Sequence, residues 1–332
     1  MKNRVFAFGK RLLGLILSLL VLSAAVFYLS RLAPGDPLVS YYGDRAEKMS
    51  AAEREWAEKK LGLDAPVSVQ YLRWLERAVH GDFGISYQYK RDVLEVIGER
   101  AGNTLLLGGA GFFLIFGGAL LLGVLCVWWE GRLPDRLLCR VGTVTSCVPE
   151  FWLSLLLIFI FAVRLRLLPS SGAYSTGGSA GAGDRLRHLL LPLAAVTLGH
   201  LWYYAYLVRN RLLEEVRAEY VLLAKSKGLG KRAILFRHCL RNLLPAYLSI
   251  LAISAPHILG GTYIIETVFS YPGLGTLVYE SARYQDYHLL MILSLLSGAL
   301  VILCNTVGQL INGRIDPRIR DPEAAAGEGA RR

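Results

Sequence analysis

The chain has few charged residues for its length. Of its 332 residues, 19% are charged and 54% are hydrophobic, and the mean hydropathy is +0.40. Soluble chains carry about 25% charged and about 45–50% apolar residues, so both values are shifted toward membrane proteins. The scarcity of charge excludes an intrinsically disordered protein.

Cysteine is also scarce, and its spacing is uninformative for metal binding. No two cysteines have the Cys-x-x-Cys spacing of a metal or redox site, and an odd number cannot pair completely within one chain. A disulfide scaffold is therefore excluded, and we expect apolar or reduced thiols. The five are Cys126, Cys139, Cys147, Cys239 and Cys304.

Motifs for ATP hydrolysis and proteolysis are lacking. A P-loop needs Gly, four residues, Gly-Lys and then Ser or Thr. The nearest string has Lys225 in place of the first glycine and Arg232 in place of the hydroxyl residue. An intramembrane metalloprotease would need His-Glu-x-x-His, which is also missing. The chain is therefore not expected to be an enzyme.

Long hydrophobic runs dominate the rest of the chain. A membrane helix needs about 20 apolar residues to cross about 30 Å of hydrocarbon. The only acidic or basic residue within these runs is Glu150. We predict an all-α, polytopic protein of the plasma or inner membrane with six transmembrane helices, at residues 12–30, 101–129, 141–163, 189–208, 242–265 and 287–313.

The distribution of basic residues predicts the orientation. With a cytosolic N-terminus, the inside segments hold 21 basic and 9 acidic residues, and the outside segments hold 16 of each. Because cytosolic loops are enriched in Lys and Arg, we predict that both termini lie inside. Topology then accounts for the net charge of +11, and no nucleic-acid partner is expected.

Four regions follow from these spans. Residues 1–30 form the cytosolic N-terminus and an uncleaved first helix, because 19 uncharged residues exceed the core of a signal peptide. Residues 31–100 form a small external helical subdomain, with helices expected over 50–61 and 67–79. Residues 101–313 hold helices two to six, with a flexible outer loop over 171–183, and residues 314–332 form a cytosolic tail.

The cytosolic segment over residues 209–242 carries mixed charges, with Gly228 and Gly230 as breaks before a second helix. This pattern is typical of a docking surface, with one short helix near residues 220–227. The alternative is a solvated loop that is basic only because it faces the cytosol.

Seven strings from residue 31 to residue 320 carry a family resemblance. They are RLAPGDP (31–37), LGLDAPVSVQYLRWL (61–75), GDFGISY (81–87), YVLLAKSKGL (220–229), RHCLRN (237–242), ETVFSYPGLG (266–275) and IDPRIR (315–320). In this order the chain resembles the membrane permeases of binding-protein-dependent ABC importers, in their peptide and nickel branch.

The resemblance implies that residues 209–242 couple to an ATPase. The family's loop generally reads Glu-Ala-Ala, three residues, Gly, nine residues, Ile-x-Leu-Pro. Leu222 replaces the glutamate here, which puts that residue's local contact in doubt, and the interval from Gly228 to Pro245 is four residues longer. The expected coupling residues are Tyr220, Ala224, Lys225, Lys227, Gly228, Leu229, Arg237, Asn242 and Pro245.

The resemblance also implies the partners. These are a second, homologous permease, two cytosolic ATPase subunits that use ATP and Mg²⁺, and an extracytoplasmic substrate-binding protein. The chain itself is expected to bind no cofactor and no metal. Di- or oligopeptides are the expected cargo, and nickel or a nickel chelate is the alternative. A stand-alone channel or secondary transporter is a remote alternative, because no internal repeat is evident.

A second site is expected where the fifth span ends. Residues 271–275 (YPGLG) cannot continue a helix. Irregular backbone at membrane depth is tolerated when it is buried in protein or lines a water-filled cavity. The outer gate is therefore one interpretation and a packed turn is the other. The candidate residues are Glu266, Phe269, Pro272, Gly273 and Gly275.

Among the polar side chains inside the predicted spans, three are further candidates. An ionisable group at this depth is costly and usually faces a cavity or a partner. Glu150 could contact the substrate or form an ion pair near the cytosolic end of its span. His200 and His257 could line a metal pathway, although hydrogen-bonded packing between helices is the commoner role.

Overall fold

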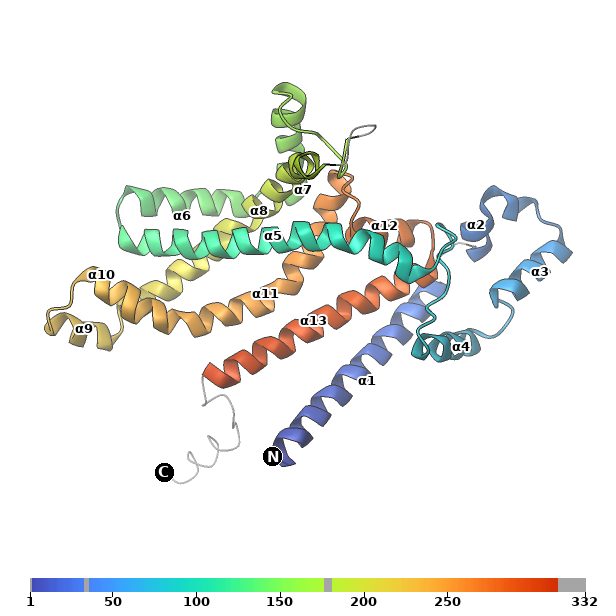
Figure 1. Cartoon of the computed structure of the whole chain (residues 1–332), viewed down its shortest axis with the longest axis horizontal. Coiled ribbons are helices and arrows are strands. Elements are labelled where there is room, and N and C mark those ends of the chain that lie inside the picture. Colours follow the sequence, from blue (N-terminus) through green and yellow to red (C-terminus); the bar gives the residue numbers. More distant parts are fainter. Residues whose placement is uncertain (1, 33–35, 176–180, 316–332) are drawn as a thin grey trace. The chain divides into compact units, whose positions relative to one another are not determined.

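The computed structural model describes residues 2–32, 36–175 and 181–315, and Figure 1 shows it as a ribbon. Within these residues the regular structure is helical, apart from one antiparallel bridge between Ile85 and Asp92. Five helices are long and apolar enough to cross a membrane, and a bent pair makes a sixth. The predicted all-α, multi-spanning fold is confirmed. Of the predicted tail over residues 314–332, the first two residues end α13, and the rest lies outside the described residues.

Thirteen α-helices occur in the described part of the chain. They are α1 (Lys2–Leu32), α2 (Pro37–Tyr42), α3 (Ala51–Leu61), α4 (Val67–Val79), α5 (Val93–Trp128), α6 (Leu133–Ser146), α7 (Glu150–Leu157), α8 (Ala182–Val216), α9 (Glu219–Ser226), α10 (Lys231–Ala233), α11 (Leu240–Val268), α12 (Leu274–Arg283) and α13 (Tyr287–Ile315). A 3₁₀ helix covers Gly43–Lys48, and π-helical turns cover Ile158–Arg164 and Ile234–Cys239.

The chain divides into two compact units. The first unit contains residues 1–104 and 272–302, and the second contains residues 105–271 and 303–332. Helices α5 and α13 therefore contribute to both. Each unit is described by itself below.

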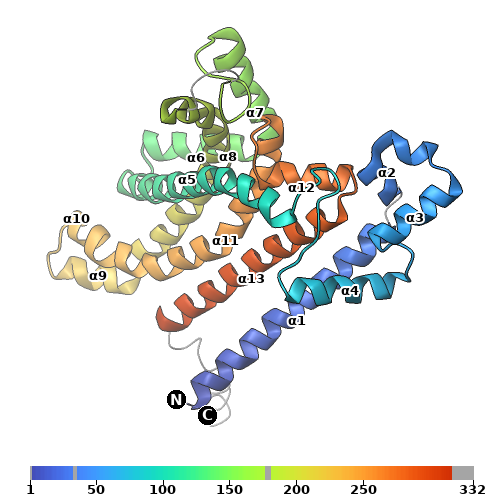
Figure 2. The same ribbon diagram turned by 45° about the vertical axis from the view of Figure 1, so that its right-hand side comes forward.

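In the first unit, α4 packs along α1 (Figure 2). Tyr71 on α4 places its hydroxyl 2.8 Å from the hydroxyl of Ser23 on α1, and the rings of Tyr71 and Phe27 lie 5.4 Å apart. Gly298 on α13 meets α1 so closely that a Cβ there would overlap Leu22. The buried core around these contacts includes Phe27, Trp74, Val93, Val96, Ile97, Leu277, Leu289 and Met291.

The two helices predicted over residues 50–61 and 67–79 are confirmed as α3 and α4. Ser50 and Glu53 form a capping box, which pairs backbone donors at the start of α3. Gly62, at φ +68°, ends α3 in the left-handed conformation that glycine adopts without strain. Pro66 then precedes the first turn of α4.

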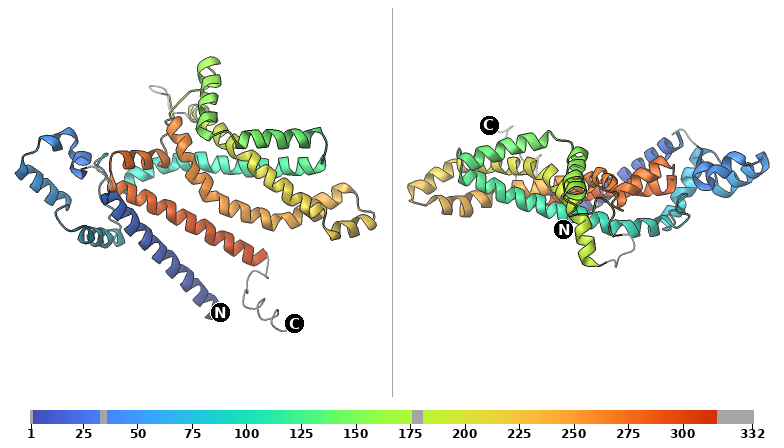
Figure 3. Two further views of the ribbon diagram at one scale, coloured as in Figure 1. Left: turned by 180° about the vertical axis from the view of Figure 1, so that it is seen from behind. Right: turned by 90° about the horizontal axis from the view of Figure 1, so that it is seen from above.

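In the second unit, α8 packs against α6, α7 and α11. Figure 3 shows α8 and α11 converging on the short helices α9 and α10. A Cβ at Gly123 of α5 would overlap Val208 of α8, so these two helices need glycine for their close approach. The core includes Leu107, Ile115, Phe116, Ala195, Val196, Leu212, Ile258 and Ile265.

The third predicted span is not one straight helix. Residues 141–163 were expected to be continuous, but α6 and α7 meet at 102°. Pro149 stands at the break, directly before α7. Proline lacks a backbone donor and disfavours helical geometry in the residue before it, so α6 cannot continue through this point.

Candidate functional site

A cavity of about 540 Å³ opens between α8 and α11 in the second unit. Two of the three polar residues predicted inside the spans, His200 and His257, line it, and the third, Glu150, contacts His200. The remaining wall is aromatic, aliphatic and hydroxylic. It consists of Gly199, Tyr203, Tyr204, Leu207, Ile250, Ile253 and Ser254.

Glu150 pairs with His200 rather than with an arginine or lysine. Its Oε1 lies 3.2 Å from His200 Nε2. The other ring nitrogen, Nδ1, lies 3.1 Å from the carbonyl oxygen of Val196 and donates to it, because a carbonyl only accepts. A hydrogen bond at Nε2 therefore needs one more proton, either on the ring or on the carboxyl group. With that proton, the pair carries no net charge.

The local backbone explains why a carboxylate is tolerated here. Glu150 is the first residue of α7, where helix N–H groups lack partners within the helix and favour negative charge. Gly199 lies opposite, and a Cβ there would come within 3.2 Å of Glu150 Cγ. The break at Pro149 and the absence of a side chain at Gly199 together allow the Glu150 carboxylate to pack against α8.

The histidines do not form a metal site in the described part of the chain. The ring centroids of His200 and His257 lie 5.8 Å apart at an interplanar angle of 72°. Across residues 2–32, 36–175 and 181–315, no group of three His, Cys, Asp or Glu side chains could hold a metal ion. The arrangement is that of aromatic and hydrogen-bonded packing beside a cavity.

The helix expected near residues 220–227 is α9. It follows α8, which continues to Val216 instead of ending near residue 208, and it packs on the π-helical turn Ile234–Cys239 that leads into α11. Gly228 stands after α9 at φ +78°, a conformation that side chains with a Cβ rarely adopt. A Cβ at Gly228 would touch nothing within 4 Å, so the requirement for glycine is conformational.

Three side-chain contacts hold α9 and its flanks. Tyr220 donates to Glu215 Oε2 at 2.7 Å, and burial followed by this hydrogen bond raises the pKa of Tyr220. Arg217 pairs with Glu130 at 2.8 Å, and Lys231 Nζ donates to the carbonyl of Trp128 at 2.6 Å. The loop is thereby attached to the end of α5 and the turn after it.

Two apolar side chains of α9 are exposed beside charged and polar ones. Leu222 is 63% exposed and Leu223 is 58% exposed, whereas Ala224 is buried. Of the other predicted coupling residues, Lys225, Lys227, Leu229, Arg237 and Asn242 are exposed, and Pro245 is half-buried within α11. The replacement of the family's glutamate by Leu222 was the signal for an apolar face, and the sequence analysis used it only to question one contact.

The predicted gate residues fall on both sides of the division between the two units. Glu266 and Phe269 are buried in the second unit, where Thr262 donates to Glu266 Oε1 at 3.1 Å and Gly172 N donates to the Phe269 carbonyl at 2.9 Å. Pro272, Gly273 and Gly275 belong to the first unit. There the Pro272 carbonyl accepts from the Asn103 amide at 2.8 Å.

One ion pair was missed by the sequence analysis. Asp135 of α6 accepts from Arg209 of α8 at both oxygens, at 2.6 and 2.9 Å, and also from Gly131 N at 2.9 Å. The two side chains are 4% and 18% exposed. They lie 74 positions apart in the sequence, so no local pattern could have paired them.

Comparisons with known proteins agree with this architecture. The family described as binding-protein-dependent transport system inner membrane component matches residues 119–321, and its N-terminal counterpart matches residues 5–108. A putative peptide permease of Brucella ovis is 33% identical, with 93% of this chain and 96% of that protein covered. The oligopeptide permease AppB of Bacillus subtilis is also 33% identical, covering 93% and 98%.

Two further similarities complete the comparison. The glutathione permease GsiC of Escherichia coli K12 is 32% identical, with 94% of this chain and 97% of that protein covered. A chain of the inward-facing MetNI methionine ABC transporter matches the fold with a TM-score of 0.54 and 19% identity, covering 67% of this chain and 97% of that one. This chain belongs to the inner membrane components of binding-protein-dependent transport systems, the multi-pass permease subunits of ABC importers.

Proposed function

We propose that the chain forms half of the translocation pathway of an ATP-driven peptide importer, with its N- and C-termini in the cytosol. The observation that carries the proposal is α9, a short helix that exposes Leu222 and Leu223 in a segment rich in basic residues. Exposed apolar patches framed by polar residues are typical of protein interfaces. The partner proposed for this face is a cytosolic ABC ATPase, and the chain itself binds no cofactor.

The position of α9 supports a mechanical role. Helix α8 precedes it, and the turn beneath it continues into α11. These are the two helices that line the cavity beside His200 and His257. A displacement of α9 by closing ATPases would therefore reach both cavity walls through continuous helices. A second, homologous permease would complete the pathway, and an external binding protein would deliver the cargo.

Peptides are the cargo that we favour. The three relatives described above are named for peptide, oligopeptide and glutathione transport. The cavity offers imidazole rings, tyrosine hydroxyls and the Ser254 hydroxyl, which suit the amide groups of a peptide. Nickel is not favoured, because the described residues hold no cluster of three metal ligands.

Uptake measurements test the proposal. Cells with and without the gene are given a labelled tripeptide and, in parallel, radioactive nickel. We expect peptide uptake to disappear with the gene and to stop when ATP is depleted at constant membrane potential. Unchanged peptide uptake in the deletion strain would refute the peptide assignment, and loss of nickel uptake alone would replace it.

Gly228→Val tests the coupling role of the loop. A β-branched residue at φ +78° is strained by about 1–2 kcal/mol or more, so we expect uptake to fall to background while the chain still inserts into the membrane. Gly228→Asn is the matched control, since asparagine tolerates this conformation, and it should keep most uptake. Normal uptake with Gly228→Val would exclude a conformational role for the loop.

A further inference from the structure

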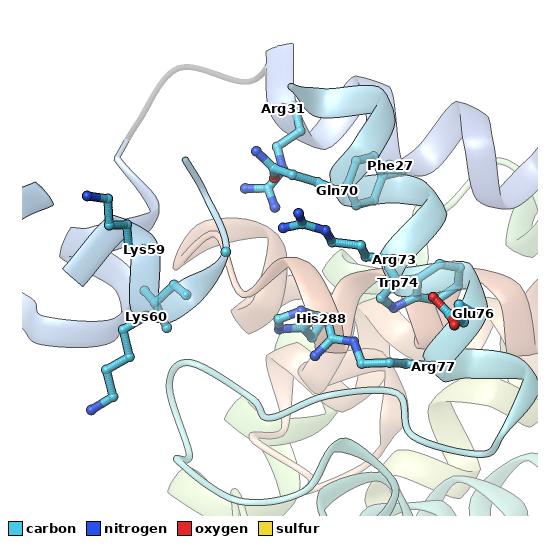
Figure 4. Close-up of a pocket in the computed structure, with 12 residues that line it drawn as sticks. Phe27, Arg31, Lys59, Lys60, Gln70, Arg73, Trp74, Glu76, Arg77 and His288 are labelled. Atoms are coloured by element: carbon cyan, nitrogen blue, oxygen red, sulfur yellow. The ribbon is translucent and has the colours of Figure 1, made fainter. Parts of the chain in front are cut away.

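A second cavity, of about 350 Å³, lies in the first unit, and it is strongly basic. Residues from α1, α3, α4 and α13 line it (Figure 4). Among the ionisable side chains in its wall are five that carry positive charge and one carboxylate. They are Arg31, Lys59, Lys60, Arg73, Arg77 and Glu76.

The arginines, and not the lysines, face the cavity. Figure 4 shows the guanidinium groups of Arg31, Arg73 and Arg77 extending into one space, whereas the side chains of Lys59 and Lys60 extend away from it. Arg73 and Arg77 stand one helical turn apart on α4, and neither forms an ion pair with a residue that the structure describes. Three guanidinium groups, on the half-buried Arg31 and the exposed Arg73 and Arg77, therefore border one cavity whose wall holds a single carboxylate, Glu76.

Buried polar atoms in the same wall also lack partners. Trp74 is 3% exposed, and its Nε1 donor has no hydrogen-bond acceptor among the described residues. The same holds for the donor Arg31 Nε and for the acceptor Gln70 Oε1. Such atoms are costly to bury unpaired. A ligand that satisfies them needs acceptor oxygens for the two donors and a hydroxyl group for Gln70.

The surroundings of the cavity indicate where such a ligand would come from. Arg31 is in the last turn of α1, at the end of the apolar stretch Leu13–Leu32. Helix α4 packs along α1, and it exposes Leu72 and Val79 as well as its arginines. An amphipathic helix against the end of a membrane span is suited to the boundary between headgroups and acyl chains.

We propose that this cavity binds the headgroup of an anionic phospholipid. The phosphate would pair with Arg31, Arg73 and Arg77, because guanidinium groups bind phosphate oxygens through paired hydrogen bonds. Trp74 Nε1 would donate to a further oxygen, and a glycerol hydroxyl of the headgroup would donate to Gln70 Oε1. The acyl chains would run beside Leu72 and α1, so the lipid would fasten the external helices to the membrane.

The test uses the full transporter complex, purified in detergent, stripped of lipid and supplied with phosphatidylglycerol or phosphatidylcholine. Native mass spectrometry counts the lipid retained by each complex. We expect retention of phosphatidylglycerol over phosphatidylcholine. The double variant Arg73→Gln/Arg77→Gln should weaken retention about thirtyfold, since each basic group near an anionic lipid contributes about a factor of five to affinity.

Two further variants separate the site from general attraction and from misfolding. Lys59→Gln/Lys60→Gln removes the same charge from side chains that point away from the cavity, and we expect less than a threefold effect. Trp74→Phe keeps the ring and removes only the Nε1 donor, and it should weaken retention severalfold. All variants are compared for elution volume and for assembly with the other subunits.

Several outcomes would overturn the proposal. Equal retention of the two lipids, or equal effects of the arginine and lysine variants, would reduce the cavity to a basic surface. Complete displacement of the lipid by millimolar glycerol phosphate would identify a site for soluble phosphate instead. If the arginine variant weakens binding of the external binding protein but leaves lipid retention unchanged, the cavity serves a protein. None of these outcomes depends on which cargo is transported.

Discussion

The two units treat charge differently. In the second unit, the buried Asp135 forms two hydrogen bonds with Arg209, and the half-buried Glu150 meets His200. In the first unit, Arg73 and Arg77 reach into a cavity without a carboxylate partner among the described residues. Where the chain supplies its own counter-charge, the charge holds helices together. Where the chain supplies no counter-charge, we expect an external ligand to supply it.

The largest effect should follow from breaking the Asp135–Arg209 pair. Asp135→Ala leaves the Arg209 guanidinium buried without its counter-charge, which costs about 3–5 kcal/mol of stability. We expect a clearly lower unfolding temperature for the detergent-solubilised complex. Arg217→Ala is the control, because its pair with Glu130 is exposed and should contribute less than about 1 kcal/mol. Similar losses from both variants would remove the distinction between buried and exposed pairs.

A smaller effect is expected at Glu150. Glu150→Gln keeps the size of the side chain, and its amide can donate to His200 Nε2, but it replaces a charged hydrogen bond by a neutral one, and we expect a loss of about 1 kcal/mol, measured as above. The same substitution at Glu95 in the first unit is the control, since its pair with Arg91 at 2.7 Å is exposed and should have no measurable effect. If Glu150→Gln instead raises stability and leaves uptake unchanged, the pair with His200 is not a stabilising contact.

The smallest effect is expected at Gly199, which leaves room for the Glu150 side chain. Gly199→Ala places a Cβ 3.2 Å from Glu150 Cγ, and we expect it to cost about 0.5–1 kcal/mol. Gly260→Ala on α11 meets nothing within 4 Å, and its lower backbone entropy in the unfolded chain should make it neutral or slightly stabilising. Thermal unfolding of the two variants side by side measures the difference. The opposite order would contradict the close approach of α7 and α8.

The sequence was most informative where structure depends on neighbouring residues. Length and hydropathy predicted the long helices, and the spacing of apolar residues predicted α3 and α4. The break at Gly228 predicted the end of α9. The bend before α7 could also have been predicted, because Pro149 stands inside the predicted third span. The apolar residues on both sides of Pro149 instead favoured one continuous helix.

Contacts between distant residues could not be predicted in this way. Glu150 and His200 are 50 positions apart, and which of many polar residues meet depends on how α7 packs against α8. Helix α8 continues to Val216, beyond the apolar run, because a helix can extend into the charged segment that begins at Arg209. The basic cavity of the first unit depends on the approach of α1 and α4, which the sequence does not indicate.

The bend between α6 and α7 has a consequence for biosynthesis. Helix α6 has 14 residues, and α7 with the π-helical turn after it has 15. Each is only about 21–23 Å long at 1.5 Å per residue, short of the 30 Å of hydrocarbon. Neither half can be released from the insertion machinery as an independent span. We therefore expect residues 133–164 to insert into the bilayer together with α8. Glu150 would then enter the bilayer only after His200 has been synthesised and can pair with it.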